Sequence, residues 1–183
     1  MIKTAILLIA LSLAAIMPGN AQDVTNTSYV SATGEKVLRV EFILPLSQTE
    51  TWQYFSNDDK LKLWIAPVVH VDLRAGGTLV TNYDKGKSLT DKSAISSDII
   101  NYIDNELLTL KVNLNDNFTK KVQDEDQNLQ EVIQLFPVDK THTKIVSSMI
   151  GWGKGADWEK TYEFFVRGNI YTYEELTKLF KGK

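Results

Sequence analysis

Hydrophobic and polar residues alternate along much of this chain, in the pattern typical of β-strands. Every second residue from 38 to 44 is apolar, whereas Arg39 and Glu41 fall on the opposite face. This alternation predicts a half-buried strand over residues 36–44. Six further strands are expected in a long antiparallel series interrupted by turn-forming residues; they cover residues 68–73, 78–83, 94–103, 107–114, 130–136 and 143–150.

Two short helices are predicted directly after the first strand. Ser47 and Glu50 have the spacing of a capping box, in which each side chain bonds the backbone N–H of the other residue. A helix is therefore expected over residues 48–55. The segment KLKLWIA, residues 60–66, predicts a second helical stretch that the following proline ends. Residues 115–128 are strongly polar and are expected to form either a short helix or a flexible excursion.

A long helix is predicted at the C-terminal end, with Asp157 as its N-cap. Seven side chains recur every three or four residues and are expected to share the inward face of this helix, six of them aromatic or aliphatic and one polar: Trp158, Tyr162, Phe165, Asn169, Tyr173, Leu176 and Phe180. A glycine inside a helix costs about 1 kcal/mol relative to alanine, so a bend, a close contact or a break is expected at Gly168. The apolar face of a curved sheet must be covered, and the long helix is expected to lie in its concavity.

Residues 1–21 have the layout of a secretory signal peptide, with one lysine, an apolar run over residues 5–17 and small residues ending at Ala21. Cleavage near Ala21 predicts export to a periplasmic or extracellular compartment; an uncleaved signal anchor is the alternative. A bilayer span needs at least about 18 apolar residues, so no transmembrane span is expected in the mature chain. Residues 22–34 are expected to form a flexible tail, and residues 35–183 a single domain.

Charge and cysteine content exclude several classes of partner. The formal net charge is −3, and the one basic cluster, formed by Lys85, Lys87 and Lys92, is interrupted by Asp84 and Asp91. Nucleic acid is therefore not an expected partner, because phosphate binding needs a basic stripe. The chain has no cysteine, so neither disulfides nor thiolate metal sites are available.

The order of elements resembles the SRPBCC domains of the helix-grip, START-like superfamily. The segments LSQTETWQYFSNDDKLKLWIAP, VDLRAGGTLV, INYIDNELLTLKV and GWGKGADWEKTYEFFVRGNIYTYEELTKLF carry the resemblance. It covers residues 37–180 and is closest to the branch named after the C-terminal domain of the activator of Hsp90 ATPase. The family's tryptophan and double-glycine positions are occupied by Trp52, Trp64, Gly76 and Gly77. The family's later Gly-Trp pair is replaced by Gly168 and Asn169.

The resemblance implies an α+β helix-grip fold, in which a curved antiparallel sheet of about six or seven strands wraps around the long C-terminal helix. It also implies an internal pocket for a small hydrophobic or amphipathic molecule between helix and sheet. The expected ligand-binding residues are Trp64, Trp158, Tyr162, Phe165, Asn169 and Tyr173. As the polar residue on an aromatic face, Asn169 either orients a ligand or pairs with a strand carbonyl, since a buried amide needs a partner.

Enzymatic chemistry finds little support in the sequence. His70 and His142 lack metal-ligand spacing, and neither a G-x-S-x-G motif nor a cysteine nucleophile is present. Asp72 and Glu106 could form an acid–base pair if the sheet brought them together, and the alternative is that each caps a turn. The glycine-rich residues 151–155 lack the layout of a phosphate-binding loop. No catalytic residue, metal or cofactor is therefore assigned.

Three functional classes remain, and each makes a different structural demand. A binding module, the favoured class, requires an open cavity of several hundred Å³. A cofactor-free cyclase or hydrolase requires two carboxylates, or a carboxylate with His70, inside that cavity. A protein-interaction or co-chaperone-like module of the cell envelope would instead show a collapsed cavity and a large exposed apolar patch.

Overall fold

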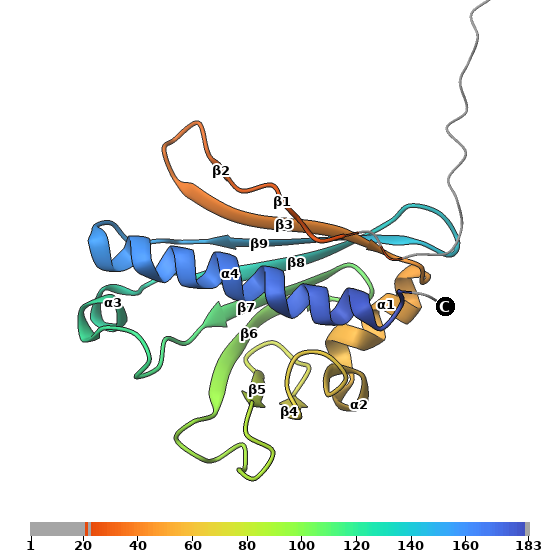
Figure 1. Cartoon of the computed structure of the whole chain (residues 1–183), viewed down its shortest axis with the longest axis horizontal. Coiled ribbons are helices and arrows are strands. Elements are labelled where there is room, and N and C mark those ends of the chain that lie inside the picture. Colours follow the sequence, from red (N-terminus) through yellow and green to blue (C-terminus); the bar gives the residue numbers. More distant parts are fainter. Residues whose placement is uncertain (1–20, 22, 182–183) are drawn as a thin grey trace, which may run out of the picture.

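The computed structural model describes Ala21 and residues 23–181, so the predicted signal peptide up to residue 20 lies outside the described residues. Nine strands in this part of the chain form one antiparallel sheet in the order β1-β3-β9-β8-β7-β6-β5-β4, with β2 also paired to β3 (Figure 1). Their bounds are β1 Thr25–Asn26, β2 Tyr29–Val30, β3 Lys36–Leu44, β4 Val68–Val71, β5 Thr78–Asn82, β6 Ile95–Ile103, β7 Leu107–Val112, β8 Gln130–Pro137 and β9 Thr143–Ile150. The expected strands of the antiparallel series are all present.

Neighbouring strands are in register, so the side chains on the concave face form rows across the sheet. One row contains Leu38, Met149, Glu131 and Leu110, and the next contains Val40, Ser147, Ile133 and Leu108. Most of these side chains are buried and apolar, which makes this face the core of the protein. Glu131 and Ser147 are the two polar members of these rows.

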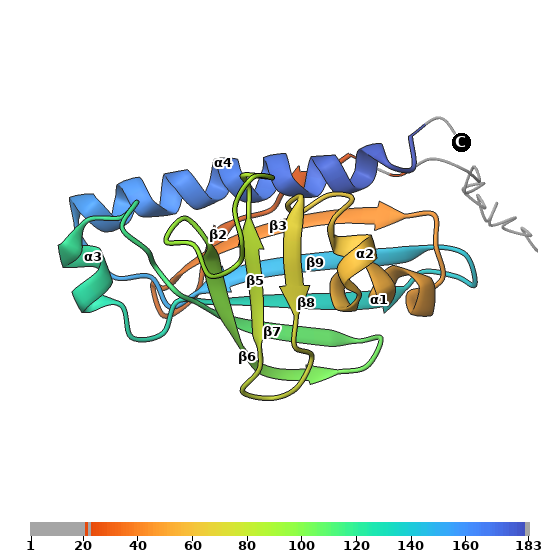
Figure 2. The ribbon, with the colours of Figure 1, turned by 90° about the horizontal axis from the view of Figure 1, so that it is seen from below.

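Four helices are present in the described part of the chain: α1 Gln48–Ser56, α2 Asp58–Leu61, α3 Lys120–Glu125 and α4 Ala156–Lys178. Figure 2 shows α4 running along the sheet, with α3 near its start and the α1–α2 pair near its end. The rings of Tyr54 in α1 and Phe180 after α4 meet edge to face at 5.3 Å. None of these helices has the length and apolarity of a membrane span.

The predicted capping box is present at the start of α1. The Ser47 Oγ accepts a hydrogen bond from the Glu50 N–H at 3.3 Å, and the Glu50 Oε2 accepts one from the Ser47 N–H at 3.0 Å. The second helix begins earlier than predicted, because the Asn57 side chain caps the backbone N–H groups of Asp59 and Lys60. It also ends earlier, at Leu61, and a turn covers residues 62–65.

The C-terminal helix differs from its prediction in two details. Its N-cap is Gly155, which has a φ of 103°, and Asp157 lies inside the first turn instead. Gly168 causes neither a break nor a close contact, because α4 is continuous and a Cβ atom at Gly168 would meet no atom within 4 Å apart from the adjacent backbone of its own helix. A glycine is therefore not required there by backbone geometry.

Part of the segment predicted as a flexible tail is paired with the sheet. The two short strands β1 and β2 both pair with β3. The Thr27 N–H donates to the Arg39 carbonyl at 2.8 Å, and Asp23 forms an ion pair with Lys181 at 2.7 Å. These backbone bonds extend the β3 edge of the sheet over residues 25–30.

Candidate ligand-binding site

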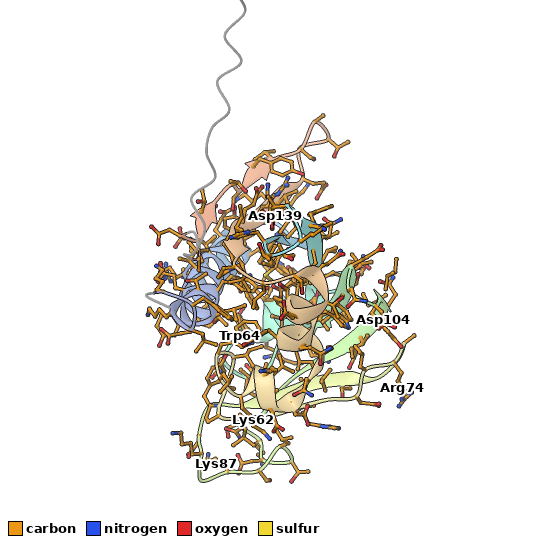
Figure 3. The ribbon with its side chains drawn as sticks, turned by 90° about the vertical axis from the view of Figure 1, so that its right-hand side faces the viewer. Lys62, Trp64, Arg74, Lys87, Asp104 and Asp139 are labelled. Atoms are coloured by element: carbon orange, nitrogen blue, oxygen red, sulfur yellow. The ribbon has the colours of Figure 1, made fainter. Side chains whose placement is uncertain are left out.

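A cavity of about 360 Å³ lies between α4 and the concave face of the sheet. Its floor is formed by strand residues such as Leu108, Leu110 and Ile133, and one end is closed by Phe55 and Trp64. Figure 3 shows Trp64 in the interior between α4 and the α1–α2 pair, whereas the labelled Arg74, Lys87 and Asp104 lie at the periphery. The large rings span the gap between helix and sheet without filling it.

The mouth of the cavity lies beside the middle of α4. Tyr83 and Tyr171 both line the cavity and are 59% and 63% exposed, so they stand where it meets solvent. Gly168 also lines the cavity, and its missing side chain leaves space between Phe164 and Tyr171, which lie about one helical turn away on either side. The rest of the polar lining comes mainly from Thr81, Ser97, Asn113, Asn115, Asn117, Asn169 and Thr172.

A loop aromatic ring closes the cavity at the α3 side. Phe118 lies between β7 and α3, and its ring stacks on Phe165 with a centroid distance of 5.5 Å and an angle of 3°. It also meets Phe164 edge to face at 5.3 Å. Such pairs contribute about 0.5–1.5 kcal/mol beyond their area burial, so the loop is held against α4.

Among the described residues, Glu131 supplies the one carboxylate that lines the cavity. Its Oε1 accepts a hydrogen bond from the Ser147 Oγ at 2.6 Å and another from the Tyr173 hydroxyl at 2.7 Å. No described residue donates to its Oε2, and this oxygen is not among the fully buried atoms without a partner. Because Glu131 is a lining residue, its Oε2 is the oxygen available to a ligand.

The charge on Glu131 influences the tyrosines around it. Burial raises the pKa of Tyr173 well above its usual value, and the nearby Glu131 carboxylate raises it further. The Tyr173 phenol therefore stays protonated and serves as a donor. Partial loss of hydration raises the pKa of Tyr83 as well, and the negative charge of Glu131 adds to that shift.

Four of the six predicted ligand-binding residues line the cavity: Trp64, Phe165, Asn169 and Tyr173. The indole of Trp64 stacks on the Tyr173 ring at 5.7 Å, and its Nε1 donates to the Tyr54 carbonyl at 3.0 Å. Asn169 does not pair with a strand carbonyl. Its Nδ2 donates instead to the Met149 sulfur at 3.2 Å, which is a weak acceptor.

The other two predicted residues, Trp158 and Tyr162, lie outside the cavity lining. Trp158 is 2% exposed, and its Nε1 donates to the Glu125 carboxylate of α3 at 2.9 Å. Tyr162 packs edge to face on Trp152 at 5.0 Å. The first two turns of α4 are thus covered by α3 and by the loop before the helix. Helical periodicity correctly predicted that these two rings lie on the inward face of α4. It could not predict that they pack against α3 and Trp152 instead of lining the cavity.

The sequence prediction missed several site residues, among them the lining rings Tyr83, Phe118 and Tyr171 and the polar pair Glu131 and Ser147. The signal for Glu131 was nevertheless present in the chain. On β8 it shares one face with Ile133 and Leu135, two buried side chains. A carboxylate at an inward position of an alternating strand indicates a polar group facing the core or a cavity.

The acid–base candidates do not meet in the cavity. Asp72 forms an ion pair with Arg74 at 2.9 Å, and His70 bonds Asp58 at 2.8 Å. Neither Asp72, His70 nor Glu106 is a lining residue. Within residues 21 and 23–181 no group of three or more histidine, aspartate and glutamate side chains is placed to hold a metal ion.

Solved structures with the same fold confirm the predicted helix-grip fold. Protein Ms6760 from Mycobacterium smegmatis has a TM-score of 0.63 and 14% identity, over 87% of this chain and 98% of its own. The Aha1 dimer from Colwellia psychrerythraea has a TM-score of 0.53 and 15% identity, over 78% and 98%. PFC0360w, an HSP90 activator from Plasmodium falciparum, has a TM-score of 0.55 and 11% identity, over 78% and 94%.

No protein-family model and no curated protein sequence matches this chain. At identities of 11–15% these neighbours establish the fold alone. A shared fold does not determine function, which depends on the cavity and its residues.

Proposed function

We propose that this protein binds a small hydrophobic or amphipathic molecule non-covalently in the cavity between α4 and the sheet. The observation that carries the proposal is the cavity itself. Its volume of about 360 Å³ lies within the range typical of small-molecule sites, and such sites combine apolar walls with a few polar groups. The proposal includes export of the protein, as its N-terminal sequence predicts.

The lining favours binding over the two alternative classes. Among the described residues it contains one carboxylate, Glu131, and no histidine, so the pair of groups required by the cyclase or hydrolase alternative is not assembled. The interaction-module alternative called for a collapsed cavity, whereas this cavity is open. Trp64, Phe165, Asn169 and Tyr173 are the proposed ligand contacts among the residues expected from the sequence.

Filling the cavity provides the test. Ser97 faces inward on β6, in a row with Leu79 and Val112, and lines the cavity. Ser97→Phe therefore places a ring inside the cavity. Ser96 pairs with Val80 on the opposite face of the same strand, so Ser96→Phe is a matched control that leaves the cavity unchanged.

The measurement is fluorescence titration with the uncharged probe N-phenyl-1-naphthylamine, on the protein purified after expression of the full chain. The original protein and Ser96→Phe should bind the probe equally, and Ser97→Phe should bind it at least about tenfold more weakly. Native mass spectrometry of the same sample would report a co-purified molecule and the mass of the N-terminus. Equal probe affinity in all three folded proteins would refute binding in this cavity.

A further inference from the structure

We propose that Glu131 recognises a positively charged amine at the polar end of the ligand. This inference rests on the proposed function, because it names the class of molecule that the cavity takes: an amphiphile with an apolar body and a protonated amine. It assigns a role to the carboxylate that apolar binding alone leaves unexplained.

The geometry of the carboxylate is the first support. Both hydroxyl donors, those of Ser147 and Tyr173, bind the same oxygen, Oε1. Ser147 is fully buried, and Tyr173 is 3% exposed, so packing fixes the two donors. The Glu131 side chain is therefore held in one orientation before a ligand arrives, and its Oε2 remains to accept a hydrogen bond from the ligand.

The charge of the cavity is the second support. No lysine, arginine or histidine occurs among the described lining residues. A partly buried carboxylate without a cationic partner is costly, and a ligand that carries the missing positive charge lowers that cost. An anionic ligand would face the same carboxylate without compensation, and a neutral alcohol would supply a hydrogen bond without charge.

The aromatic surface beside the carboxylate is the third support. Tyr173 donates to Glu131 and stacks with Trp64, with ring centroids 5.7 Å apart. Ring faces attract cations, and tryptophan does so most strongly. A carboxylate next to stacked rings thus suits an ammonium head, while Leu108, Leu110 and the other apolar floor residues suit its hydrocarbon chain.

Three ligands with the same hydrocarbon chain separate these contributions: decylamine, decanol and decanoate. Their affinities are measured at neutral pH by displacement of N-phenyl-1-naphthylamine, below the micellar concentrations of decylamine and decanoate and below the solubility limit of decanol. Decylamine should bind at least about tenfold more tightly than decanol, as expected for a hydrogen bond between charged groups. Decanoate should bind most weakly.

Glu131→Gln tests the assignment to this residue. The amide oxygen of glutamine can still accept hydrogen bonds from Ser147 and Tyr173, but the negative charge is lost. The affinity for decylamine should fall at least about tenfold, and that for decanol should change less than about threefold. Glu106→Gln is the matched control, because Glu106 is exposed and lies outside the cavity.

The outcomes distinguish this inference from the proposed function. If decanol or decanoate binds as tightly as decylamine, or if folded Glu131→Gln keeps the decylamine affinity, the inference is wrong and cavity binding stands. If the uncharged probe and all three ligands fail to bind, the proposed function itself fails. If Glu131→Gln does not fold, the order of the three affinities in the unaltered protein decides.

Discussion

Replacing Gly168 by alanine should stabilise this protein. The residue lies in the middle of the continuous helix α4, where a Cβ atom would meet no atom within 4 Å apart from the adjacent backbone of its own helix. Alanine in a helix interior is favoured over glycine by about 1 kcal/mol, because it restricts the unfolded chain more. With no clash to offset this gain, the free energy of unfolding should rise by about 1 kcal/mol.

Urea denaturation followed by circular dichroism measures this change. In a thermal melt of a chain of this size, a gain of about 1 kcal/mol in the free energy of unfolding corresponds to a rise of about 2–4 °C in Tm. Because the methyl group is small and Gly168 lies at the cavity mouth, affinity for N-phenyl-1-naphthylamine should stay the same. A loss of stability in Gly168→Ala would refute the reasoning, since it would mean that the space beside the helix is occupied.

The same substitution at Gly153 should have the opposite effect. A Cβ atom there would lie 2.1 Å from the Nε1 of Trp158, a separation at which one of the two groups must move. Moving the indole would disturb its hydrogen bond to Glu125. Gly153→Ala should therefore lower the free energy of unfolding by about 1–3 kcal/mol, as overpacking does. Equal responses at the two glycines would contradict the steric argument.

Two further predictions concern stability outside the cavity. Trp158→Phe removes the hydrogen bond to Glu125 and should lower the free energy of unfolding, measured in urea, by about 1–3 kcal/mol. The affinity for N-phenyl-1-naphthylamine should not change. A loss of probe binding in the folded variant would mean that Trp158 contributes to the site. The Thr141 backbone N–H and the His142 side chain lower the pKa of Asp139 from 3.8 to about 2. The ionised Asp139 therefore stabilises the fold at pH values above 3.8. This stabilisation is lost as the pH falls towards 2. Between pH 5 and 2 the Tm of the original protein should therefore fall more steeply than the Tm of Asp139→Asn. Parallel plots of Tm against pH for the two proteins would refute the pKa argument.

The sequence was most informative where a single periodic pattern covers many residues. Alternation identified β3 at residues 36–44, and the three-to-four spacing identified nearly all of α4. The same spacing could not say which turn of α4 faces the cavity. That depends on α3, which formed within a polar segment without a periodic signal and covers Trp158. The start of α4 carried no side-chain signal, since Gly155 caps this helix through its backbone conformation, whereas the capping box marked the start of α1 correctly.

Attachment of α4 at its ends explains why a cavity survives beneath its middle. Trp158 binds α3 at the start of the helix, and Phe180 meets Tyr54 of α1 at the end. Between these points the helix presents Gly168, the residue with the least bulk, beside the mouth. The cavity between this part of the helix and the strand residues stays open although both ends of α4 are packed. Substitutions of Trp158 or Phe180, whose contacts attach the two ends of α4, should therefore lower stability without changing ligand affinity, whereas loss of the charge at Glu131 should lower affinity for an amine.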